Sequence, residues 1–187
     1  MLLVEVEISL VVGLPRRSVS HSVSDVYTRA MTLVRPAEVE DLPEVAKLAA
    51  ALVRQHYEFD PLRFMLIPNA EVGYARFLRG QLDDGESLVL VAERDDAIVG
   101  YAYARLEPRD WNNLLDACGA LHDLYVAEPA RRSGVARALA LEVCARLKEK
   151  GAPRVVLHTA SPNAGAHAFF KSLGFRQTML EMTRELP

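Results

Sequence analysis

The stretch Arg131-Arg132-Ser133-Gly134-Val135-Ala136 joins an apolar run, Leu121 to Val126, to a helical pattern that extends from Val135 to Lys150. The first N–H groups of a helix have no intrahelical partner, and the helix dipole places partial positive charge beside them. Because Gly134 lacks a Cβ, a phosphate can approach the backbone, and the arginines add charged donors. This order of strand, basic loop and helix start predicts an anion site, with a solvated basic surface as the alternative.

Two motifs in the second half of the chain resemble those of the GCN5-related N-acetyltransferase (GNAT) family. Arg131-x-x-Gly134-x-Ala136 resembles the pyrophosphate-binding signature of that family, Gln/Arg-x-x-Gly-x-Gly/Ala. Asn163, Phe170 and Gly174-Phe175 resemble its closing motif, Asn-x-x-Ala-x-x-x-Tyr-x-x-x-Gly-Phe, except that Phe170 stands where the family has Tyr. The two motifs occur in the order of the family, and the resemblance is firm over roughly residues 88–176.

The order of predicted elements also agrees with that family and predicts a mixed α/β fold with helices on both faces of a central sheet. The resemblance implies that this sheet is mostly antiparallel and that the strand 121–126 and the next strand splay apart. The expected strands are 32–35, 88–93, 98–106, 121–126, 154–159 and a final strand or hairpin over 175–186, and the expected helices are 38–57, 71–82, 135–150 and a short one from about 164 to 174.

The bulk composition predicts an ordinary globular protein. With 187 residues, 50% of them hydrophobic and 25% charged, the chain suits one domain with a full core. A net charge of −3 argues against a general nucleic-acid binder, and no apolar run is long enough for a membrane helix. The two cysteines give no disulfide framework and no metal spacing, so we expect no metal site and a reducing, cytoplasmic setting.

The N-terminal region is set apart from the predicted domain. Residues 2–12 alternate like a strand, and residues 15–25 are rich in Ser and Arg like a linker. Three interpretations stay open for residues 1–30: an added strand, a disordered leader, or the product of an upstream start codon. The resemblance implies an N-acetyltransferase domain over residues 31–187.

The resemblance implies that acetyl-CoA is the co-substrate, and it assigns the contacts residue by residue. Its pantetheine arm is expected in the gap between the splayed strands. Asn163 is expected to bind pantetheine, although a helix N-cap is an equally simple role for it. The other expected coenzyme-binding residues are Leu124, Tyr125 and Val126 on the splayed strand, Arg131, Arg132, Ser133, Gly134, Val135, Ala136 and Arg137 around the pyrophosphate, and Phe170.

The reaction implied by the resemblance is direct transfer of the acetyl group from the thioester to a primary amine in a ternary complex. An ammonium is not a nucleophile, so a base must accept its proton. His122 is the first candidate, because its ordinary pKa suits this role and arylalkylamine acetyltransferases of the same family carry His there. A histidine packed on the sheet is the alternative. His158 is the second candidate. Strand alternation predicts that Asp123 faces the other way, unless a bulge reverses it, and is structural.

The departing thiolate also needs a proton. Phe170 has no hydroxyl, so the general acid of many family members is missing, and Tyr125 or water is expected to replace it. This departure keeps a non-catalytic acyl-CoA-binding module as one alternative function. A protein acetyltransferase that acts on Lys or on an N-terminus is the other.

Loops between helices and strands often determine specificity. The acceptor is expected to be a small-molecule amine bound by such loops, and the candidate substrate-binding residues are His56, Tyr57, Phe59, Asp60 and Trp111. The segment Met179 to Thr183 has strand character and predicts a homodimer, since such a strand can pair across a two-fold axis.

Overall fold

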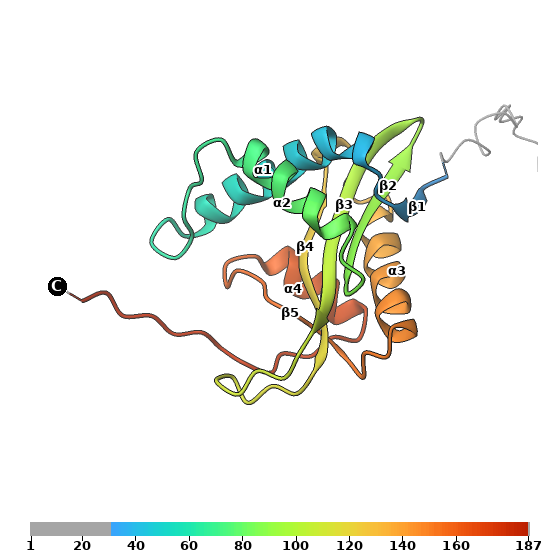
Figure 1. Cartoon of the computed structure of the whole chain (residues 1–187). Coiled ribbons are helices and arrows are strands. Elements are labelled where there is room, and N and C mark those ends of the chain that lie inside the picture. The colour runs from blue at the N-terminus through green and yellow to red at the C-terminus, as the bar shows by residue number, and fades with distance from the viewer. Residues whose placement is uncertain (1–30, 187) are drawn as a thin grey trace, which may run out of the picture.

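The computed structural model describes residues 31–186, so the expected N-terminal extension lies outside the described part of the chain. Five strands form one sheet in sequence order, with the first four antiparallel to their neighbours and the last one parallel to the fourth (Figure 1). The mostly antiparallel sheet predicted from the sequence is therefore confirmed. The strands are β1 (Leu33–Pro36), β2 (Ser87–Arg94), β3 (Ala97–Glu107), β4 (Cys118–Val126) and β5 (Val155–Leu157).

Helices cover both faces of this sheet, as predicted (Figure 1). One face packs against α1 (Leu42–Phe59) and α2 (Ala70–Leu82), and the other packs against α3 (Val135–Glu149). The remaining helices are the short η2 (Val39–Asp41) and η3 (Glu128–Ala130), together with α4 (Ala164–Ser172). Within residues 31–186, no helix is long and apolar enough to span a bilayer.

Alternation along β3 separates the two cores. Ala102 and Ala104 face α3, whereas Tyr101 and Tyr103 face α1 and α2. The alanines leave room for α3 to pack directly on the sheet. At Gly119 of β4 the approach is so close that an added Cβ would lie 2.7 Å from Cδ1 of Leu147. The tyrosines place hydroxyl groups on the opposite face, under α1 and α2.

A β-bulge in β4 changes which side chains face α1 and α2. Tyr103 pairs with Asp123 and Ala104 pairs with Leu121, so His122 is the extra residue between them. His122 stacks on Tyr103, and Asp123 accepts a hydrogen bond from Tyr101, so both side chains are on the α1/α2 face. Strand alternation predicted the opposite face for Asp123 unless a bulge reversed it, and this bulge does reverse it.

The two parallel strands separate after a short paired segment. Gly119–Leu121 pairs with Val155–Leu157, and β5 then ends while β4 continues to Val126. The predicted strand 154–159 is therefore shorter in the structure. The predicted final strand was wrong, since residues 175–186 form no strand and are mostly exposed. A strand needs a neighbouring backbone, and this segment has no ladder partner within the described part of the chain.

Candidate active site

The segment predicted to bind an anion, residues 131–136, is called the anion loop here. It leads from η3, after β4, into the start of α3. Gly134 has φ 96° and caps α3, and Arg132 has φ 61°. The first intrahelical bond joins the Ala138 amide to the Gly134 carbonyl (3.0 Å), so the preceding amides are those that the helix leaves without intrahelical acceptors. An added Cβ at Gly134 would meet nothing within 4 Å. The space in front of these amides is therefore open.

Two contacts brace this loop from β2 and from η3. The Ser133 hydroxyl donates to the Ala130 carbonyl (2.6 Å), and Arg94 donates from Nη1 to Oγ of Ser133 (3.1 Å). Arg94 also donates from Nη2 to Oγ1 of Thr32 (2.7 Å). Sequence analysis did not identify Arg94, because no local pattern shows that the end of β2 lies beside a loop 39 residues later.

Arg131, which was predicted to lie beside a pyrophosphate, contacts protein groups in this structure. Its Nε donates to the Val126 carbonyl (3.0 Å), and its Nη2 donates to the Tyr125 hydroxyl (3.2 Å) and to Oε1 of Gln55 in α1 (3.4 Å). The guanidinium carbon lies 5.3 Å from the centroid of the Tyr125 ring. The side chain thus contacts β4 and α1.

The end of β4 presents backbone groups where β5 is no longer its partner. Val126 pairs with Gly100, and the Ala127 amide donates to the Val99 carbonyl (2.9 Å). Because bonding alternates along an antiparallel ladder, Leu124 and Val126 direct their backbone groups away from β3, toward the gap beyond β5. These are two of the residues from which pantetheine contacts were predicted.

The closing motif lies at α4. Asn163 accepts from the Ala166 amide at Oδ1 (3.0 Å), which confirms its role as an N-cap. Phe170 is only 8% exposed, and its ring centroid lies 5.0 Å from that of Phe169 and 5.5 Å from that of Phe175. Phe170 therefore belongs to the α3-side core, which suits an apolar residue at this place.

The bulge gathers ionisable groups on the α1/α2 face. Tyr101 donates to Oδ2 of Asp123 (3.0 Å). Burial raises the pKa of the Asp123 carboxyl, although the Tyr101 hydrogen bond and the charges of His122 and His56 oppose this shift. Burial and the nearby Asp123 charge raise the pKa of Tyr74 to about 12. A partly buried carboxyl with a raised pKa is a typical proton acceptor. Asp123 is therefore a candidate general base, although the sequence analysis had given it a structural role.

His122 lies beside Asp123 but is more exposed. Its Nε2 is 3.0 Å from Oε1 of Glu107, and its ring stacks on Tyr103 with centroids 5.2 Å apart. The side chain is 42% exposed. A carboxylate that holds one ring nitrogen fixes the orientation of the imidazole, so His122 is also arranged for proton transfer.

The predicted substrate residues near the end of α1 lie on the same side as this cluster. His56 donates from Nδ1 to the Leu52 carbonyl (2.9 Å), and its ring contacts Phe64 and Phe59, with centroids 4.9 Å and 6.3 Å away. Tyr57 is 37% exposed. Asp60 uses its carboxylate within the loop, because Oδ1 accepts from the amides that follow it. That bonding indicates a turn-forming role.

Trp111 and His158 lie elsewhere. Trp111 is 74% exposed in the loop between β3 and β4, and the guanidinium carbon of Arg109 lies 5.1 Å from its ring centroid. This loop precedes β4, whereas the anion loop follows it. His158 is exposed just after β5. The hydrogen bond from Arg63 lowers the pKa of Glu181, with a smaller contribution from the charge of His158. His158 is therefore close to the C-terminal segment.

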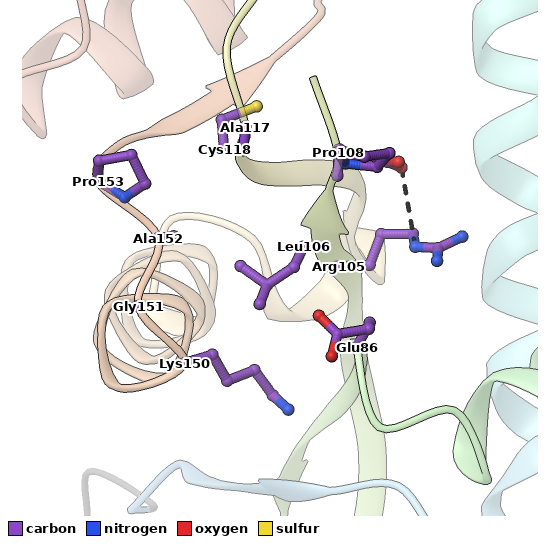
Figure 2. Close-up of a pocket in the computed structure, with 11 residues that line it drawn as sticks. Glu86, Arg105, Leu106, Pro108, Ala117, Cys118, Lys150, Gly151, Ala152 and Pro153 are labelled. Carbon is purple, nitrogen blue, oxygen red and sulfur yellow. Dashed lines mark ion pairs between the residues drawn. The ribbon is translucent and has the colours of Figure 1, made fainter. Parts of the chain in front are cut away.

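A shallow pocket of about 380 Å³ opens at the start of β4 and at the C-terminal end of α3 (Figure 2). Cys118, Leu106 and Lys150 line it, and Arg105 pairs with Glu107 at 3.8 Å. This pocket is separated along β4 and α3 from the anion loop, which lies at their other ends. It is therefore not the coenzyme site. Within residues 31–186 no cluster of His, Cys, Asp and Glu is arranged to hold a metal ion.

Comparison with known proteins identifies the family of this chain. The model of the acetyltransferase (GNAT) family matches residues 49–175, which include the anion loop, the bulge and the closing motif. The chain belongs to this family. Two curated relatives are human N-acetyltransferase 8, 31% identical over 100 residues, and mycothiol acetyltransferase of Thermomonospora curvata, 26% identical over 99 residues. The matches cover 54% and 53% of this chain but only 43% and 31% of those proteins.

Solved GNAT-like structures share the fold at low sequence identity. A mutant of the BH1408 protein of Bacillus halodurans is 24% identical, with a TM-score of 0.72 over 83% of this chain and 99% of that one. The aminoglycoside N-acetyltransferase AAC(6')-Iy, solved in complex with CoA, is 20% identical, with a TM-score of 0.70 over 86% and 98% of the two chains. These structures confirm the predicted GNAT fold.

Proposed function

We propose that this GNAT protein transfers the acetyl group of acetyl-CoA to the primary amine of a small molecule. One observation carries the proposal. The bulge in β4 places the Asp123 carboxyl on the α1/α2 side of the strand, next to the Leu124 backbone that faces the gap beside β5. A proton acceptor and a slot for an extended ligand therefore lie on adjacent residues.

The residues around the gap fit acetyl-CoA. Gly134 leaves open space in front of the first amides of α3, where the helix dipole favours an anion such as pyrophosphate. The backbone of Leu124 and Val126 would hold the pantetheine arm, with Asn163 across the gap. Arg132 and Arg137 are exposed and add positive charge to the loop. When bound, acetyl-CoA supplies a thioester carbonyl to the attacking amine.

Protein residues then accept the proton of the ammonium, and a protein residue or water supplies one to the thiolate. The Asp123 carboxylate attracts the ammonium of the acceptor and takes one of its protons, which leaves the amine nitrogen with a lone pair for attack. Tyr101 keeps the carboxyl oriented through its hydrogen bond. His122, held by Glu107, is the competing base, and His158 is the next candidate. Since Phe170 has no hydroxyl, the thiolate receives its proton from water or from Tyr125.

A cationic acceptor with an apolar body suits this face. The carboxyl of Asp123 complements an ammonium. The rings of Phe64 and Phe59 around His56, and the exposed ring of Tyr57, complement an apolar or ring-bearing group. The alternatives are a protein Lys or N-terminal acetyltransferase and a non-catalytic acyl-CoA-binding module. The relative named N-acetyltransferase 8 supports N-acetylation, which the small-molecule and the protein acetyltransferase share.

The experiment is a measurement of thiol release from acetyl-CoA across three groups of acceptors: small primary amines, Lys peptides and peptides with free N-termini. We expect turnover with small amines, and a preference for peptides would instead support the protein acetyltransferase. Acetyl-CoA at about 100 times its Kd should also stabilise the folded protein by about 2.7 kcal/mol, which raises Tm. A Tm shift without thiol release from any acceptor would support the binding module.

We also propose a homodimer formed through the C-terminal segment. Met179, Leu180 and Met182 are 73%, 73% and 87% exposed, and β5 has a ladder partner on one side only within the described residues. An edge strand and an unpaired apolar segment can each be completed by a second copy. Sedimentation should give twice the chain mass of 20.7 kDa, and Leu180→Lys should shift it toward the monomer. A wild-type protein that stays at the chain mass at every concentration contradicts the dimer.

We propose a cytoplasmic setting, as expected from the cysteine usage. Both Cys118 and Cys144 are free thiols in the structure, and burial raises the pKa of each.

A further inference from the structure

Arg131 is exposed, and its guanidinium has several protein partners. It contacts the Val126 carbonyl, the hydroxyl and ring face of Tyr125, and Gln55 in α1. These partners lie on β4 and α1, whereas the backbone of Arg131 belongs to the anion loop. One side chain therefore links the loop before α3 to the helix on the acceptor side.

Arg131 is exposed, as are Arg132 on the same loop and Arg137 in the first turn of α3, which lie near the open space at Gly134. Arg131 differs from them in its contacts with β4 and α1. To reach a phosphate in that space, Arg131 would have to leave these partners, and the Val126 carbonyl would lose its donor.

From these contacts we infer that Arg131 is a positioning residue, which couples occupancy of the anion loop to α1 rather than binding the pyrophosphate itself. The inference rests on the proposed function, because it takes CoA as the ligand of the loop. Gln55 immediately precedes His56, whose charge acts on the Asp123 carboxyl, and Tyr125 lies two residues after Asp123. A loop ordered by the coenzyme fixes Arg131, and Arg131 then holds α1 and Tyr125 around the acceptor site.

Coupling of this kind is reciprocal and has a consequence that does not depend on the acceptor. If Arg131 carries it, CoA should slow amide hydrogen exchange in the last turns of α1, residues 52–59. A phosphate ligand with no link to α1 would protect the anion loop and the start of α3 only. The pattern of protection therefore separates positioning from phosphate binding.

The test combines calorimetric titration with CoA and hydrogen exchange on the full chain. Arg131→Ala should bind CoA within about threefold of wild type and lose the protection of α1. The matched control, Arg132→Ala, should weaken CoA binding by about tenfold, the loss of one charge-assisted contact, and keep that protection at saturating CoA. Gln55→Ala, which cuts only the link to α1, should also lose it. Arg131→Lys keeps the positive charge but lacks the planar guanidinium that donates to several partners, so it should behave like Arg131→Ala.

Three results would overturn the inference. The first is a loss of CoA affinity in Arg131→Ala as large as that in Arg132→Ala, which would make Arg131 a phosphate ligand. The second is equal protection of α1 in wild type and Arg131→Ala. The third is wild-type protein that does not bind CoA, and this one also removes the proposed function. Because the first two require a wild type that binds CoA, failure of the inference alone is distinguishable.

Discussion

Replacement of Gly134 by Leu should weaken binding of acetyl-CoA by about 100-fold or more. Gly134 has φ 96°, in the left-handed region that L-residues avoid, and it stands before the first amides of α3. A Leu side chain would occupy the open space in front of the loop, which the phosphates need. Loss of two hydrogen bonds to a charged group, each worth about 1.5–3 kcal/mol, is enough for an effect of that size. Calorimetric titration measures it directly.

Gly151 offers a matched control at the other end of the same helix. It has φ 92°, and an added Cβ there would also meet nothing within 4 Å. Gly151→Leu should therefore impose a similar backbone strain, of order 1–3 kcal/mol, and lower Tm without a change in Kd for acetyl-CoA. If Gly134→Leu kept the wild-type Kd, or if both variants lost affinity equally, the phosphate would not sit on this loop.

The parts of the fold that local chemistry determines could be predicted from the sequence. Asp95 and Asp96 lie between the predicted strands 88–93 and 98–106, and they have φ 51° and 58°, as a tight hairpin requires. Gly151 and Gly174 end α3 and α4 with φ 92° and 89°. Asn163 caps α4. Each of these residues has a backbone preference that acts over a few positions.

The parts that depend on contacts between distant residues could not be predicted. The bulge at His122 is a mismatch of register with β3, and no residue of β4 signals it. The direction of Arg131 depends on α1, 76 residues earlier. The segment 175–186 has strand alternation, but a strand requires a partner backbone, and its strongest contact is the ion pair of Glu181 with Arg63 in the loop after α1. These contacts between distant residues determine how side chains are arranged on the proposed acceptor side.

The second large effect is expected at Asp123. Asp123→Asn should lower kcat/KM by about 100-fold or more, the low end for loss of a positioned general base, while Kd for acetyl-CoA stays close to wild type. Asn is isosteric and can still accept from Tyr101, so the fold around the bulge is kept. Asp60→Asn is the control, because that carboxylate also lies on the acceptor side but is used by its own loop. It should keep most of the rate.

His122→Gln decides between the two bases. If His122 is the base, this variant should lose about 100-fold and Asp123→Asn should lose much less. In either case the rise of kcat/KM with pH, measured with one fixed acceptor, should follow the group that accepts the proton. With Phe170 in place of Tyr, the profile should lack a fall from a tyrosine-like acid below about pH 9. Near-normal rates in both variants would leave His158 as the next residue to replace.

The stability of the Asp123→Asn variant relative to wild type gives a second test of Asp123, because the direction of its pH dependence can be predicted. Because burial raises the pKa of this carboxyl in the folded protein, its ionised form destabilises the fold. Below the unfolded-state pKa of about 4 both states carry the proton and nothing is lost. As pH rises from there through the raised pKa, wild type loses stability that Asp123→Asn keeps. The variant should therefore have a higher Tm than wild type at neutral pH and an equal one near pH 3, measured by calorimetry. A lower Tm at neutral pH would show that the carboxylate stabilises the fold, and Asp123 would return to the structural role that alternation first suggested.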